Sequence, residues 1–68
     1  MKKVSFVIPC YRSEHTLPHV VKEIREKMQE LTQYEYDIFL VNDASPDNTM
    51  GTIRDLCDKY DNIKGIGF

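Results

Sequence analysis

Two short polar segments of this 68-residue sequence hold most of the side chains that could do chemistry. They are PCYRSEH at residues 9–15 and NDASPDN at residues 42–48. Between them they offer an aromatic ring, a cation and several oxygen acceptors, on Tyr11, Arg12, Glu14, Asn42, Asp43, Ser45 and Asp47. An aromatic face stacks on a planar ring, and carboxylates accept hydrogen bonds from N–H groups and hydroxyls. This combination indicates a polar ligand that carries a ring.

The same segments are unusual for a phosphate site. Neither G-x-G-x-x-G nor a P-loop is present, and Gly65-Ile66-Gly67 is an isolated G-x-G inside a strand pattern. Carboxylates repel phosphates, but they suit the N–H groups of a base and the hydroxyls of a ribose. The residues therefore favour a nucleoside with Tyr11 stacked on its base, and a pyrophosphate would be neutralised by a metal held elsewhere.

Size and composition describe one small globular domain. The sequence is 41% hydrophobic and 29% charged, and its net charge of -2 argues against a general nucleic-acid-binding face. No apolar run is long enough to span a membrane, and the run in MKKVSFVIP is too short for a signal peptide. We therefore expect a cytoplasmic chain. Its two cysteines, Cys10 and Cys57, are expected to be reduced and to pack as small apolar residues.

The hydrophobic pattern predicts five elements. Strands are expected at residues 4–9, 36–41 and 63–68, and helices at residues 16–31 and 47–60. Ser13 or Thr16 is expected to cap the first helix. Its predicted apolar face comprises Leu17, Val20, Val21, Ile24, Met28 and Leu31, and that of the second helix comprises Met50, Ile53, Leu56, Cys57 and Tyr60.

This β-α-β-α-β order predicts an α/β fold with a parallel, Rossmann-like sheet. Right-handed crossovers allow two main strand orders. The order 3-2-1 places both helices on one face and leaves the other face bare, whereas 2-1-3 covers both faces and suits a free-standing module. We favour 3-2-1, which makes the chain an incomplete part of a larger domain. In either order ligands bind at the carboxyl ends of the strands, where the two polar segments follow neighbouring strands.

The segments VSFVIPCYRSEHTLPHVVKEI and YDIFLVNDASPDNTMGTIRDL resemble the N-terminal nucleotide-binding half of family 2 glycosyltransferases, which have the GT-A fold. The shared motifs are the strand ending in Pro-Cys-Tyr, Glu14 in the following loop, and the Asn-Asp-x-Ser-x-Asp-x-Thr block. The resemblance covers essentially residues 1–68 and is closest to the polyprenyl-phosphate glycosyltransferase branch.

The resemblance implies substrate-binding roles for four residues. Pro9 and Tyr11 would hold the base, Glu14 would lie near the base or ribose, and Asp43 would accept a hydrogen bond from a base N–H. Glu14 has a competing explanation, because a carboxylate is also favourable in a first helical turn. Arg12 and Ala44 replace an asparagine and a glycine that are common in the family.

The resemblance also implies an inverting transfer from a UDP- or GDP-sugar donor to a hydroxyl or polyprenyl-phosphate acceptor. The divalent metal (Mg or Mn), its D-x-D ligands and the catalytic base would lie beyond Phe68, as would any part that associates with the cytoplasmic face of a membrane. This implies a cell-envelope enzyme, of which this segment alone is inactive.

Two alternative interpretations remain open, one for individual residues and one for the whole chain. Ser45 and Asp47 are better explained as the turn and cap of the second helix than as ligand contacts. The chain could also be a free-standing nucleotide-binding or receiver-like regulatory module without catalysis. A receiver, however, would need its acidic cluster after the first strand and a phosphorylatable aspartate at the end of the third.

Overall fold

The computed structural model describes residues 2–67, and its five elements follow the predicted order. They are β1 (Lys2–Cys10), α1 (Leu17–Glu30), β2 (Tyr34–Asn42), α2 (Thr49–Lys59) and β3 (Ile63–Gly67). β1 and β2 extend beyond the predicted apolar runs at both ends, because backbone pairing continues past the side chains that reach the core. The last residue of the predicted third strand, Phe68, lies outside the described residues.

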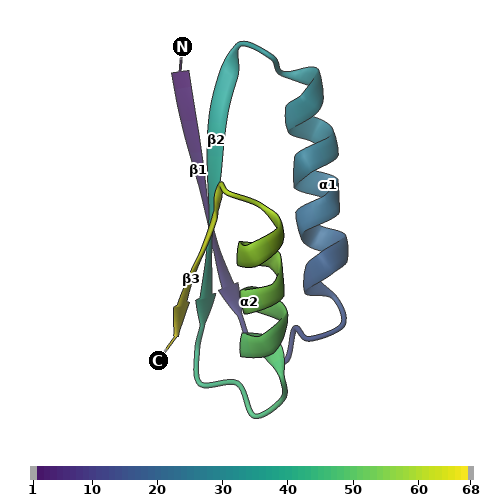
Figure 1. Cartoon of the computed structure of the whole chain (residues 1–68), viewed down its shortest axis with the longest axis vertical. Coiled ribbons are helices and arrows are strands. Elements are labelled where there is room, and N and C mark those ends of the chain that lie inside the picture. The colour runs from purple at the N-terminus through teal and green to yellow at the C-terminus, as the bar shows by residue number, and fades with distance from the viewer. Residues whose placement is uncertain (1, 68) are drawn as a thin grey trace.

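The three strands form a parallel sheet with β2 in the centre. Leu40 of β2 pairs with Ile8 of β1 on one side and with Gly65 of β3 on the other. The order β1-β2-β3 is the predicted 3-2-1 order counted from the opposite edge. Both helices lie on the same side of the sheet (Figure 1). The favoured strand order and its one-sided helix layer are therefore confirmed.

The core lies between the sheet and the two helices. Its side chains come from every element and are 8% exposed or less: Cys10, Leu17, Val21, Ile38, Leu40, Ile53, Leu56 and Ile63. Met50, Cys57 and Tyr60 pack against this cluster, which confirms the predicted apolar face of α2. On α1 the prediction was too wide. Val20 is 38% exposed and Leu31 41% exposed, whereas Leu17, Val21 and Met28 of the same predicted face are buried and Ile24 packs against the core.

The predicted cap of α1 is correct in position at Thr16 but wrong in chemistry. Thr16 is the residue before α1, but its side chain makes no capping hydrogen bond. The Leu17 N–H instead donates to the main-chain oxygen of Ser13, at 2.9 Å. α2 begins at Thr49, two residues later than predicted, because the preceding residues form a turn.

The opposite face of the sheet carries no helix from residues 2–67 (Figure 1). We call it the open face: the side chains of Val7, Pro9, Phe39, Val41 and Ile66, which alternate with the core side chains along their strands. Val7 is 67% exposed and Ile66 43% exposed. Parallel sheets are usually covered on both faces. A large part of this face is therefore apolar surface without a partner in the described part of the chain.

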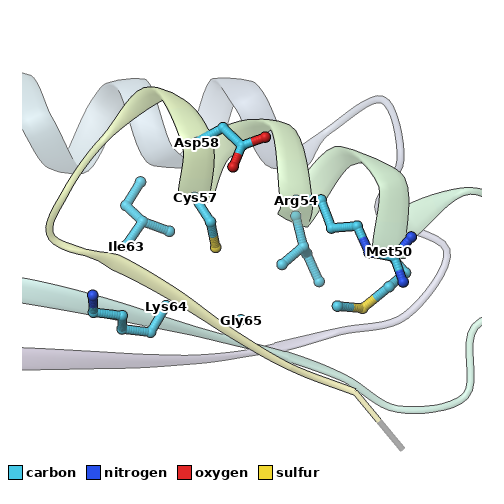
Figure 2. A pocket seen from close by; sticks show the side chains of 8 residues that line it. Met50, Arg54, Cys57, Asp58, Ile63, Lys64 and Gly65 are labelled. Atoms are coloured by element: carbon cyan, nitrogen blue, oxygen red, sulfur yellow. The ribbon is translucent and has the colours of Figure 1, made fainter.

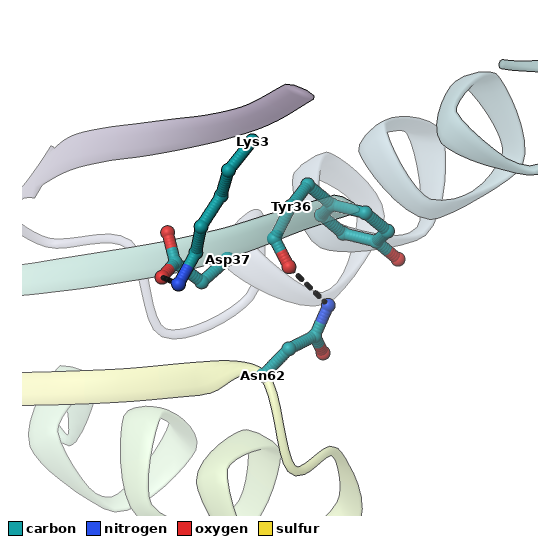
Figure 3. A network of polar contacts seen from close by, with 4 residues as sticks. All are labelled: Lys3, Tyr36, Asp37 and Asn62. Carbon is teal, nitrogen blue, oxygen red and sulfur yellow. Dashed lines mark hydrogen bonds and ion pairs between the residues drawn. The ribbon is translucent and has the colours of Figure 1, made fainter. Parts of the chain in front are cut away.

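Polar contacts set the strand register at the end of the sheet where the strands begin (Figure 3). Lys3 Nζ and Asp37 Oδ2 are 3.1 Å apart and join β1 to β2. The Asn62 side-chain amide donates to the main-chain oxygen of Tyr36, at 3.2 Å. The Ile38 N–H donates to the main-chain oxygen of Asn62, at 2.9 Å. A shift of one residue would break these contacts and turn the strand faces over, so they also determine where the loops emerge at the far end.

Candidate functional site

The polar segments predicted to form a site are brought together at the carboxyl ends of β1 and β2. We call residues 11–16 and 43–48 the ligand edge. In Figure 1 both segments leave the same end of the sheet, beside the start of α2. Main-chain N–H groups of the first segment donate to side chains that follow β2: Arg12 to Ser45 Oγ at 2.8 Å, and Ser13 to Thr49 Oγ1 at 2.9 Å. In the other direction, the Asp43 N–H donates to the Cys10 oxygen, at 3.1 Å.

Thr49 and Asp47 are the centre of this connection. Thr49 is fully buried, and its hydroxyl accepts from Ser13 and donates to Asp47 Oδ1. The same carboxylate oxygen accepts from the Ser45 hydroxyl, at 2.5 Å, and from the Thr49 N–H, at 3.1 Å. These hydrogen bonds, first from Ser45 and then from Thr49, lower the pKa of Asp47 to about 2. Asp47 therefore stays ionised at neutral pH and satisfies an N–H group at the start of α2.

Ser45 and Asp47 thus have the structural role predicted for them. The Ser45 N–H donates to Asn42 Oδ1, at 3.2 Å, which closes a turn of the kind that asparagine side chains favour. The buried Asn42 side chain thereby holds the chain where it leaves β2. Three donors, from Ser45 and Thr49, converge on Asp47 Oδ1, so this oxygen is engaged in the turn and in the start of α2.

Glu14 also bridges the two segments. Its Oε1 accepts from the Asn48 N–H, at 3.1 Å, and its main-chain oxygen accepts from the Thr52 hydroxyl, at 3.1 Å. This position stabilises the N-terminus of α2, where the helix dipole favours a negative charge. The predicted contact of Glu14 with a base or ribose stays a prediction, and one of its two carboxylate oxygens already has a donor.

Tyr11 and Asp43 lie where the sequence predicted them, each on the first residue after its strand. Tyr11 is 56% exposed, and Asp43 is exposed. Neither the Tyr11 hydroxyl nor the Asp43 carboxylate makes a hydrogen bond within residues 2–67. Pro9 is two residues before this edge, and its ring is on the open face. Tyr11 and Asp43 therefore keep a ring face and an acceptor available for a ligand.

Two residues of the ligand edge have left-handed backbones. Arg12 and Ala44 both have φ of 50°. Such a conformation costs a residue with a Cβ about 1–2 kcal/mol, and strained residues of this kind gather at functional sites. At Arg12 the hydrogen bond to Ser45 Oγ offsets part of this cost.

Replacing Ala44 by glycine is expected to stabilise the protein by about 0.5–1 kcal/mol. Glycine relieves the left-handed penalty, and its greater loss of backbone entropy on folding cancels part of that gain. Urea unfolding followed by circular dichroism measures the difference. Cys10→Gly is the control. Cys10 is buried in β1, so glycine at this position should destabilise the protein. A destabilised Ala44→Gly protein would contradict the left-handed backbone.

Sequence reasoning gave no individual role to Thr49 or Asn42. Both appeared within the Asn-Asp-x-Ser-x-Asp-x-Thr block, but neither was distinguished from its polar neighbours. One signal in the sequence could have indicated a buried hydroxyl at Thr49. This threonine directly precedes the apolar face of the second helix. The partner of that hydroxyl, Ser13, is 36 residues away, so no local pattern could name it.

A separate cleft of about 370 Å³ lies between α2 and β3 (Figure 2). Met50, Arg54, Cys57 and Lys64 are among its lining residues, and it contains none of the four predicted substrate-binding residues. Burial raises the pKa of the Cys57 thiol, as it does for Cys10. Both thiols therefore stay protonated at neutral pH, in line with their predicted packing roles.

Two further features of residues 2–67 concern metal ligation and membrane-spanning helices. Within residues 2–67, no three or more His, Cys, Asp or Glu side chains are grouped as they would be around a metal ion. These residues do not fit the expected divalent metal, so no step through a metal follows from them. Neither described helix has the length and apolar character needed to cross a bilayer.

The fold and the ligand edge together define a three-stranded parallel α/β unit with two hydrogen-bonded loops at the carboxyl end of the sheet. A family model described as "Glycosyl transferase family 2" matches residues 5–67. The chain therefore belongs to the family 2 glycosyltransferases, which confirms the resemblance and the Rossmann-like fold.

Individual relatives agree with this assignment. The chain is 36% identical to undecaprenyl-phosphate 4-deoxy-4-formamido-L-arabinose transferase of Proteus mirabilis, over 91% of this chain and 19% of that protein. It is 41% identical to bactoprenol glucosyl transferase of Shigella phage SfV, over 79% and 17%. It is 31% identical to a dolichyl-phosphate beta-glucosyltransferase of Trichomonas vaginalis, over 88% and 20%. The chain thus spans about a fifth of the length of the curated relatives it matches.

Proposed function

We propose that this chain is the part of a family 2 glycosyltransferase that binds the nucleotide of a sugar donor. The observation that carries the proposal is the position of Tyr11 and Asp43 on two loops that hydrogen bonds join into one edge. The Tyr11 ring offers a stacking face for a base, and the Asp43 carboxylate offers an acceptor for a base N–H. In this proposal Pro9 would hold the base together with Tyr11, and Glu14, whose Oε1 accepts from the Asn48 N–H, would lie near the base or ribose.

In the whole protein, a UDP- or GDP-sugar would be the donor in an inverting transfer to a polyprenyl phosphate or another hydroxyl or phosphate acceptor. This acceptor class is supported by the names of two relatives, which contain undecaprenyl phosphate and dolichyl phosphate. A divalent metal, with ligands outside this chain, would supply charge neutralisation of the leaving diphosphate. Such an enzyme would work at the cytoplasmic face of a membrane and serve the cell envelope.

The strand order also bears on the alternative of a free-standing regulatory module. The order 2-1-3, with helices on both faces, would favour that alternative, whereas β2 lies in the centre and both helices cover one face (Figure 1). We therefore propose that the chain is the N-terminal part of a larger domain. The remainder of that domain is the occupant we assign to the open face, because the relatives are about five times as long as the matched segment.

Asp43→Ala is expected to weaken nucleotide binding about tenfold or more, because a hydrogen bond to a charged group contributes about 1.5–3 kcal/mol. Saturation-transfer NMR with UDP and GDP on the whole protein measures it through the signals of the base protons. Asp55→Ala is the matched control, since it removes an exposed carboxylate from α2 outside the ligand edge. Equal signals from the Asp43 variant and the unmodified protein would remove Asp43 from the site.

A further inference from the structure

The charged side chains of the ligand edge divide into two groups. Glu14 and Asp47 accept hydrogen bonds from donors within the two segments and help to hold them together. The Asp43 carboxylate and the Arg12 guanidinium make no ion pair within residues 2–67. Arg12 is also the single Lys or Arg in residues 11–16 and 43–48. Among the charged side chains of this edge, the Asp43 carboxylate and the Arg12 guanidinium are therefore the acceptor and the cation that make no hydrogen bond or ion pair within residues 2–67.

The backbone of Arg12 is held in place by the neighbouring segment. Its N–H donates to Ser45 Oγ, at 2.8 Å, and its φ of 50° directs the chain away from the line of β1. The Arg12 guanidinium carbon lies 5.6 Å from the centre of the Tyr11 ring. That distance is within the range of a cation–π contact. The cation and the aromatic ring thus form one continuous surface on adjacent residues.

This surface matches two parts of a nucleotide. A base presents a flat ring, and the phosphate beyond the ribose presents several anionic oxygens. Arginine recognises phosphate through a planar set of N–H donors on a long side chain, so it can reach past a ribose from the residue next to the stacking ring. The carboxylates of the ligand edge cannot supply this contact, because they repel the phosphate.

Resting on the proposed function, we propose that Arg12 contacts the phosphate of the bound nucleotide, so that one loop recognises the base through Tyr11 and the anion through Arg12. The site then selects nucleotides over nucleosides through a residue of this chain. The competing explanation is that Arg12 only packs on Tyr11 and improves the stacking of the base. The two explanations differ in one measurable way, which is whether the effect of Arg12 depends on the phosphate.

The test is a calorimetric titration of the whole protein with uridine, UMP and UDP, and with the guanosine series, in EDTA so that no divalent cation shares the phosphate. We expect Arg12→Ala to weaken UDP or GDP binding about tenfold and to change nucleoside binding less than about twofold. Arg12→Lys keeps the charge and should recover part of the loss. Lys22→Ala is the matched control, because it removes an exposed cation from α1 and should leave every affinity unchanged.

Each other outcome has a separate meaning. Equal loss of nucleoside and nucleotide binding in Arg12→Ala would show that Arg12 acts through Tyr11 and would overturn the phosphate contact while leaving the nucleotide site intact. An Arg12→Ala protein that binds UDP and GDP as well as the unmodified protein would also overturn it. If the unmodified protein bound neither the nucleosides nor the nucleotides of both series, in EDTA and again with Mg²⁺ added, the proposed function itself would fail.

Discussion

Replacing Val7 by aspartate is expected to destabilise the whole protein by about 3 kcal/mol or more. Val7 is 67% exposed in this chain and pairs in register with Phe39 on the open face. If the rest of the domain covers that face, the new carboxylate is buried without a partner, and such burial is among the most costly single substitutions. Urea unfolding of the whole protein, followed by circular dichroism, gives the change in free energy.

Val20→Asp is the matched control for this prediction. It makes the same chemical change on α1, at a position that is 38% exposed and lies on the helix layer instead of the open face. We expect it to cost about 1 kcal/mol or less. If the Val7→Asp protein unfolded at the same urea concentration as the unmodified protein, the open face would be exposed to solvent. The proposal that the chain is part of a larger packed domain would then be wrong.

The second large effect is expected at Thr49, where valine replaces the hydroxyl with a methyl group of similar size. The substitution leaves the Ser13 N–H without its acceptor and removes one donor from Asp47. Unpaired polar groups of this kind cost about 1–3 kcal/mol each, so we expect a loss of about 2 kcal/mol. Nucleotide binding should weaken as well, since the segment that carries Tyr11 loses a contact to the start of α2.

Two measurements separate this effect from general damage to the core. Amide hydrogen exchange of Ser13 should speed up in Thr49→Val more than exchange of residues in the centre of β2. Thr49→Ser keeps the hydroxyl and should restore the protection of Ser13, although it loses a buried methyl group. Unchanged exchange at Ser13 in Thr49→Val would contradict the role of Thr49 in joining the two segments.

Much of the fold could be predicted from local pattern. The runs around Phe6 and Ile38 alternate or continue as strands do, and the spacing of Ile53 and Leu56 is helical, because side-chain period follows directly from backbone geometry. Errors arose where tertiary contact decides the result. Val20 and Leu31 have the right spacing for the core, yet both are more than a third exposed in the folded chain.

The candidate site divides in the same way. The sequence by itself determined that Tyr11 and Asp43 follow strands, and in a parallel sheet the carboxyl ends of strands share one edge. It also carried the family resemblance, since the motifs are local. Those two facts are enough to predict a site, and the family match agrees with them.

Only the tertiary structure decided what the other polar residues of that edge do. Glu14 meets Asn48 and Ser13 meets Thr49 across more than 30 residues of chain, so neither pairing follows from spacing. A carboxylate or hydroxyl has the same chemistry whether it holds a loop or binds a ligand, and the difference lies in which donors the fold brings within reach. The two aspartates after β2 show this: Asp47 is occupied within its own turn, whereas Asp43 keeps its carboxylate for a ligand.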